Sequence, residues 1–307
     1  MKMRKSTILI LLAFFSTYVF WGSTYLWNKI AVAELPAFML ASIRFLVAGV
    51  LVLVIAKILK KPLSISLKQF RNVVIASVLF LVFGNGAFVY ALQFVDSGFA
   101  ALEASINPLM ILIIMRLYQK KPIQLRSLIG IALGIIGMYV LVSQKGLNLQ
   151  DGSITGILII FACVLSWSIG SVFVSQAELP SNFFVSTGYQ MFCAGVLLGV
   201  ISLLAGDTWT APNSWQTDTQ ISMLCLVLFG SIAAFTSFNY LLKKVSPEKV
   251  STSGYVNPII ALLLGWYFLG ESITLQTIIA GSLLLLGVYF INTRKEKRRT
   301  KISSRSV

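Results

Sequence analysis

Two ionisable residues stand inside long apolar runs of the sequence. Arg44 lies in the run from residue 36 to 59, and Glu103 lies in the run from residue 98 to 118. A guanidinium presents a fixed fork of N–H donors that suits a carboxylate. A glutamate can accept from that fork or carry a proton. The hypothesis is that Arg44 and Glu103 form a gate or coupling pair, which a substrate or a proton disrupts.

The other candidates inside apolar runs are amide and aromatic side chains, which can hydrogen-bond to a small molecule or stack against it. With Arg44 and Glu103, the candidate substrate-binding residues are Trp21, Tyr25, Asn85, Tyr90, Asn107, Trp167, Gln190, Asn239, Tyr240 and Asn257. For each of these side chains alone, packing inside the protein is the alternative interpretation.

Two prolines, Pro108 and Pro258, each follow an asparagine near the middle of an apolar run. Proline removes one hydrogen bond of a helix, here leaving the carbonyls of Ala104 and Gly254 without it. In hydrocarbon such groups must be satisfied by protein or by a water-lined cavity. The pattern indicates either that these two helix breaks line a pathway or that they are packing kinks.

The sequence lacks the residues that several kinds of chemistry require. The chain has no histidine, and its three cysteines lie inside apolar runs without a CxxC spacing. A metal site, a disulfide framework and Ser-His or Cys-His catalysis are therefore not expected. No GxxxxGK[ST] phosphate loop is present, so ATP is not the expected energy source. We expect no catalytic residue, no metal and no cofactor.

The composition indicates that most of the protein surface faces lipid. Of the 307 residues 57% are hydrophobic and 11% are charged, whereas a soluble domain has about 25% charged residues. The net charge of +15 is spread in short clusters between apolar runs and not over one face, so we expect lipid and a small molecule as partners and no nucleic acid.

Ten apolar runs are each about 20 residues long, the length that crosses a bilayer as a helix. They are residues 8–27, 36–59, 73–94, 98–118, 123–142, 154–175, 183–205, 221–242, 250–269 and 273–292. The predicted fold is an all-α membrane protein of ten transmembrane helices. With the N-terminus inside, 22 of the 25 Lys and Arg residues fall on the cytoplasmic side, as the positive-inside rule requires. We expect a multi-pass protein of the plasma membrane, here a bacterial inner membrane, with both termini cytoplasmic and a basic tail at 293–307.

The two halves of the chain resemble each other at a spacing of 146–150 residues. The matched positions include Trp21 with Trp167, Arg44 with Gln190, Tyr90 with Tyr240, and the two Asn-Pro pairs. A further match, of Ala33 to Pro36 with Ala177 to Pro180, has a spacing of 144 residues. A unit of five spans is odd in number, so its second copy enters the membrane from the opposite side. We predict two inverted five-helix repeats, 8–143 and 154–292, an arrangement typical of secondary transporters.

The predicted depth of Arg44 in the membrane supports a functional role for it. It lies about 12 Å below the outer surface and Glu103 about 7 Å, at 1.5 Å per residue. A guanidinium at such depth costs about 2.5–3.5 kcal/mol, so it should face a polar interior. The alternative is that Arg44 snorkels to the surface and Glu103 lies among headgroups.

These residues also carry a family resemblance. Trp21-Gly22-Ser23, Lys29, Arg44 and the two Asn-Pro pairs, with Leu269-Gly270-Glu271, resemble the EamA-type ten-helix carriers of the drug/metabolite transporter superfamily. The resemblance implies export or exchange of small metabolites, often amino acids, by alternating access. Span one has no acid, unlike small multidrug relatives, so cationic drug export is disfavoured. The alternative function is a membrane-embedded enzyme or accessory protein acting on lipid-linked substrates.

The inverted repeat makes a prediction about sidedness. Single cysteines placed at Ile65 and Asn213, in a variant without Cys163, Cys193 and Cys225, should react with an impermeant thiol reagent from opposite sides of the membrane. Labelling of both positions from the same side would contradict the inverted topology.

Overall fold

The computed structural model describes residues 5–91, 104, 106–120, 124–143, 153–269 and 274–292. Within these ranges the regular elements are all helices, which confirms the predicted all-helical class. Six helices are long and apolar enough to cross a membrane by length and composition. Shorter apolar helices cover residues 107–118, 125–137 and 278–291.

The helices of the first half follow the predicted apolar runs. They are α1 (Lys5–Phe15), η1 (Ser16–Phe20), α2 (Trp21–Ala31), α3 (Ala37–Ile58), α4 (Leu67–Ser77), η2 (Val78–Ala87), α5 (Phe88–Ala91), α7 (Asn107–Gln119) and α8 (Leu125–Val142). Elements α1, η1 and α2 follow one another without a break, as do α4, η2 and α5. The run at 98–118 is described as a helix only from Asn107 onward.

The second half repeats this order. Its elements are α9 (Ser153–Gln176), α10 (Phe183–Leu204), the short 3₁₀ turn η4 (Pro212–Ser214), α11 (Thr217–Cys225), η5 (Leu226–Phe235), α12 (Thr236–Lys244), α13 (Pro247–Val250), α14 (Ser253–Leu269) and α15 (Leu275–Asn292). Elements α11, η5 and α12 form one apolar stretch from Thr217 to Lys244.

Three of these spans contain a π-helical segment, which periodicity did not predict. The segments η2 and η5 are each ten residues long and begin 148 positions apart, at Val78 and at Leu226. A π-helix is wider than an α-helix and occurs often at functional sites. Both halves therefore carry the same local distortion in their third span.

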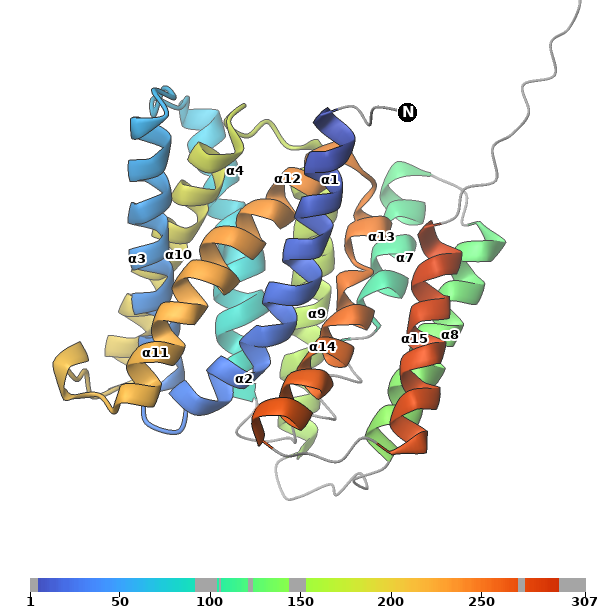
Figure 1. Ribbon diagram of the computed structural model, residues 1–307. Coiled ribbons are helices and arrows are strands. Elements are labelled where there is room, and N and C mark those ends of the chain that lie inside the picture. The colour runs from blue at the N-terminus through green and yellow to red at the C-terminus, as the bar shows by residue number, and fades with distance from the viewer. Residues whose placement is uncertain are drawn as a thin grey trace, which may run out of the picture.

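Two helix pairs occupy the two ends of the molecule. Helix α3 packs along α10 at one end, and α8 packs along α15 at the other (Figure 1). The largest hydrophobic cluster joins α3 and α10 to the helices beside them, and includes Phe45, Phe80, Met191 and Phe238. A smaller cluster around Tyr255 and Leu284 lies beside the α8–α15 pair.

Glycines let α3 and α10 approach until their backbones touch. A Cβ added to Gly49 would lie 2.6 Å from the backbone nitrogen of Phe192, and one added to Gly195 would lie 2.6 Å from that of Leu46. Further along, Gly188 faces Leu53. Residues with higher numbers on α3 thus contact residues with lower numbers on α10, so the two helices run antiparallel.

Helices α8 and α15 approach in the same way. A Cβ on Gly130 would lie 2.7 Å from the carbonyl oxygen of Gly287, and one on Gly137 would lie 3.0 Å from that of Ala280. Small residues at helix contacts permit such close packing in membranes, where van der Waals contact replaces the hydrophobic drive between helices. These contacts also place α8 and α15 antiparallel.

Polar contacts connect the loops between spans to neighbouring helices near both ends of α3. At its C-terminal end, Lys68 Nζ lies 2.7 Å from Glu178 Oε2, and Lys243 Nζ donates to the Ala177 carbonyl at 2.8 Å. At its N-terminal end, the backbone N–H of Gln216 donates to the Glu34 carboxylate, with 3.2 Å to each oxygen. In both glutamate contacts, a residue between the first two spans of one half meets the start of the third span of the other.

The glycine contacts make a stability prediction. Gly49→Ala should lower the free energy of unfolding by about 1–3 kcal/mol, because its methyl group would press on the α10 backbone. Gly281→Ala is the matched control, since a Cβ there meets nothing within 4 Å. Thermal unfolding in detergent measures both, and equal midpoints for the two variants would contradict the proposed contact.

Candidate functional site

Arg44 lies inside the protein and not in lipid. Among the described residues it is the charged side chain that is fully buried, with 4% of its surface exposed. Its Nε donates to Ser231 Oγ at 2.8 Å, and its guanidinium carbon lies 5.0 Å from the ring centroid of Phe45. A buried guanidinium in a membrane protein faces the interior because lipid cannot solvate it.

The Arg44 site is built where α2, α3 and η5 meet at Gly230. Trp21 Nε1 donates to the Gly230 carbonyl at 3.0 Å. A Cβ on residue 230 would lie 2.6 Å from Thr24 Cγ2 and 2.9 Å from Arg44 Nη2. A side chain at position 230 would press on Thr24 and on the guanidinium, and Gly230 and Ser231 of η5 both lie against Arg44.

A second polar site lies between α10 and α12. Gln190 is fully buried and donates from Nε2 to Ser186 Oγ at 3.1 Å. Asn239 donates from Nδ2 to Thr187 Oγ1 at 3.3 Å. The side-chain oxygens of Gln190 and Asn239 have no partner among the described residues. This site therefore offers buried acceptors, whereas the Arg44 site offers donors.

The two polar sites lie at different depths. Because Gly49 faces Phe192 in the antiparallel α3–α10 pair, the level of Arg44 on α3 corresponds to Leu197 on α10. Gln190 is seven residues from Leu197, which is about 10 Å along the helix axis.

An aromatic cluster joins the two sites. Its members are Trp21 of α2, Phe80 of η2, Trp167 of α9 and Phe238 of α12. The ring centroids of Trp21 and Trp167, which are matched in the repeat, lie 5.7 Å apart. Phe238 lies 4.9 Å from Trp21 and 5.4 Å from Trp167, and Phe80 lies 4.9 Å from Trp167. Trp21 is hydrogen-bonded to Gly230 of the Arg44 site, and Phe238 precedes Asn239 in the chain, so the cluster has members next to both sites.

Three predicted aromatic residues lie apart from this centre. Tyr25 is 37% exposed. Tyr90 stacks on Phe38, with 5.4 Å between ring centroids and 17° between planes. Tyr240 packs against Phe183 at 5.4 Å and lies 6.0 Å from the Lys244 ammonium. These ring contacts of Tyr90 and Tyr240 are thus with residues other than Arg44.

The two Asn-Pro pairs differ in their surroundings. Pro258 lies inside α14. When the Asn257 amide is turned so that its nitrogen faces the neighbouring carbonyl oxygens, this nitrogen donates to the carbonyls of Thr17 and Tyr18 at 3.1 and 3.0 Å. It also donates to the carbonyl of Ser253 at 3.0 Å. Asn257 thus forms hydrogen bonds to two carbonyls of the π-helical segment η1. In this way α14 is fastened to the first span.

In the first half, Pro108 lies in the first turn of α7, and the Asn107 Oδ1 has no partner among the described residues. The mid-helix position expected for Pro108 is not seen in α7, although residues 92–103 and 105 before it are outside the described ranges. Asn85 Oδ1 is likewise buried without a described partner. Glu103 lies outside the described residues, and so does its predicted pairing with Arg44.

Sequence reasoning missed the residues that hold the candidates in place. Gly230, Ser231, Ser186 and Thr187 are small, and small residues also occur throughout membrane helices as packing residues. A buried arginine requires a hydrogen-bond acceptor nearby, and that requirement was the one available signal for Ser231. Within the described ranges, no group of three or more Cys, Asp or Glu residues gathers as a metal site would.

The chain has relatives in sequence and in fold. The profile of the EamA-like transporter family matches residues 7–143 and again residues 154–293. The uncharacterized inner membrane transporter YedA of Escherichia coli K12 is 35% identical over 284 residues, which cover 92% of this chain and 90% of the relative. The uncharacterized transporter YoaV of Bacillus subtilis 168 is 24% identical and covers 94% of this chain and 98% of its own length.

A solved crystal structure has a TM-score of 0.79 at 17% identity, covering 93% of this chain and 96% of its own, and shows likeness of fold. The family match confirms the resemblance to drug/metabolite transporters and the multi-pass membrane setting. The chain belongs to the EamA-like transporter family.

Proposed function

We propose that this transporter exports or exchanges small metabolites, most specifically amino acids or their derivatives, by alternating access across the plasma membrane. The observation that carries this proposal is the buried Arg44 guanidinium, held by Ser231 in the middle of an apolar protein. Its charge has to be matched by an anion or by water, because an unmatched charge at this depth is costly.

A carboxylate is the chemical group that suits Arg44. A guanidinium has five N–H donors, and the one from Nε is used by Ser231. Among the described residues the salt bridge present joins Lys68 and Glu178, away from Arg44. The Nη donors can therefore take a substrate carboxylate in a bidentate pair, which is stronger and more directional than a neutral hydrogen bond.

The second polar site suits the other end of an amino acid. The free oxygens of Gln190 and Asn239 can accept from an ammonium group, which carries three donors and no acceptor. The aromatic cluster of Trp21, Trp167 and Phe238 has members next to both sites. We infer that these rings block the pathway and that they move to let the substrate pass from one polar site to the other.

The antiparallel helix pairs support an architecture of ten helices in two inverted repeats. Gly49 and Gly195 are matched in sequence, and each touches the backbone of the other's helix at an equivalent place. Such reciprocity is the mark of two copies related by a two-fold axis. Because the paired helices are antiparallel, that axis lies in the membrane plane, as in transporters with inverted repeats.

The two glutamate contacts support alternating access. Glu178 with Lys68 fastens one end of the molecule, and Glu34 with the Gln216 N–H fastens the other. Both contacts are exposed, and the Lys68–Glu178 salt bridge contributes about 0–1 kcal/mol, so it can open at small cost. We infer that they close the inner and the outer end in turn, with both chain termini cytoplasmic, and that Glu103 remains the proposed coupling partner of Arg44.

Counterflow in proteoliposomes tests the proposal. An amino acid enriched in the medium of overexpressing cells serves as the labelled substrate. Arg44→Gln should reduce uptake about tenfold or more, since a hydrogen bond to a charged group contributes about 1.5–3 kcal/mol. Arg44→Lys should be intermediate, because an ammonium keeps the charge but loses the fork.

Arg116→Gln is the matched control, because Arg116 is an exposed residue in the last turn of α7. It should transport like the parent protein. Thermal unfolding of each variant separates lost binding from lost folding. Parent-like counterflow by a folded Arg44→Gln protein would contradict the proposal, and recovery of a chemically altered product would point to the membrane-embedded enzyme instead.

A further inference from the structure

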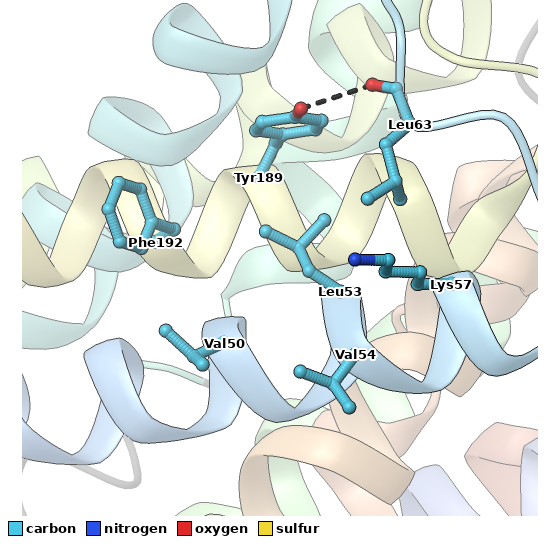
Figure 2. A pocket seen from close by; sticks show the side chains of 7 residues that line it. All are labelled: Val50, Leu53, Val54, Lys57, Leu63, Tyr189 and Phe192. Carbon is cyan, nitrogen blue, oxygen red and sulfur yellow. Dashed lines mark hydrogen bonds between the residues drawn. The ribbon is translucent and has the colours of Figure 1, made fainter.

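A groove of about 350 Å³ runs between α3 and α10 on the outer face of this helix pair (Figure 2). It is lined by Val50, Leu53, Val54, Lys57, Leu63, Tyr189 and Phe192. Val50 and Val54 are each 46% exposed and Phe192 is 39% exposed. The groove therefore opens toward lipid and is separate from the buried Arg44 site.

One charged residue, Lys57, is among those that line this apolar groove. In Figure 2 the Lys57 side chain extends along α3 toward Leu53, and the described residues that line the groove include no acid. The other polar side chain in the lining is Tyr189, whose hydroxyl donates to the Leu63 carbonyl at 3.0 Å. An ammonium beside apolar walls suits a ligand that is anionic at one end and apolar along its length.

More positive charge stands where α3 ends. Lys60 N–H donates to the Lys57 carbonyl and Lys61 N–H to the Ala56 carbonyl, both at 2.9 Å. This helix-ending turn requires a left-handed residue, usually glycine, yet Lys60 occupies it with φ 53°. Lys60 thus adopts a conformation that costs a residue other than glycine about 1–2 kcal/mol.

Helix α10, whose C-terminal end matches that of α3 in the repeat, ends in a similar turn that carries no lysine. Gly206 takes the left-handed position with φ 78°, and Asp207 follows it. Leu203 stands 146 positions after Lys57. Trp209 donates from Nε1 to Ser202 Oγ at 3.0 Å, and its ring reaches toward Gly199. The cationic groove is thus confined to the α3 end of the helix pair.

We propose that this groove binds an acyl chain of an anionic phospholipid, with the lipid phosphate held by Lys57 and supported by Lys60 and Lys61. Basic residues at the membrane border attract anionic headgroups by about 1 kcal/mol each, and the apolar walls give the chain a fixed place. Lipid binding here does not depend on which substrate the transporter carries.

Binding of phosphatidylglycerol and phosphatidylcholine to the purified full chain, compared by native mass spectrometry, tests the proposal. The parent protein should retain phosphatidylglycerol in preference to phosphatidylcholine. Lys57→Gln should reduce that preference about fivefold, the effect of one border charge. Val54→Trp should fill the groove and reduce retention of both lipids, and its exposed position makes normal folding the expected result.

Arg71→Gln is the matched control, because it removes one exposed charge from α4, outside the groove. Its preference for phosphatidylglycerol should equal that of the parent. An equal loss in Arg71→Gln and Lys57→Gln would overturn the proposal in favour of a diffuse basic surface. A Val54→Trp variant with a changed oligomeric state and unchanged lipid retention would overturn it in favour of contact between copies of the chain.

Discussion

The arrangement of this protein follows from one constraint: a guanidinium that lipid cannot solvate must be enclosed by protein. Arg44 meets this constraint through Ser231 and through the space that Gly230 leaves open. Three elements, α2, α3 and η5, have to converge on that point. The wider backbone of η5 and the Trp21 hydrogen bond to Gly230 are parts of the same solution, so the polar interior and the packing of the helices cannot be separated.

The outer frame of the molecule is held by contacts of a different kind. Glycines bring α3 onto α10 and α8 onto α15 with backbone close to backbone, which places rigid pairs at the two ends of the molecule. The helices between them carry the aromatic cluster and the polar groups. Exposed contacts such as Lys68 with Glu178 are weak by comparison. Each of the two pairs joins one helix of the first half to one helix of the second, so these contacts hold the two halves together.

The sequence was sufficient for the helical fold because apolar runs of about 20 residues have one solution in lipid. It also predicted a buried Arg44, since a charge in such a run must face inward. It did not predict the π-helical segments, because π- and α-helices share nearly the same hydrophobic pattern. Ser231 was missed because position along a helix does not tell which neighbour a side chain will meet. The partner predicted for Arg44, Glu103, lies outside the described residues.

The most direct test of a carboxylate-binding Arg44 changes the substrate and leaves the protein intact. Counterflow of a transported amino acid is measured in competition with the same compound as its free acid and as its uncharged amide at the carboxyl group. The account predicts strong competition by the acid and at least about tenfold weaker competition by the amide. Equal competition by both compounds would show that no carboxylate is recognised and would contradict the account.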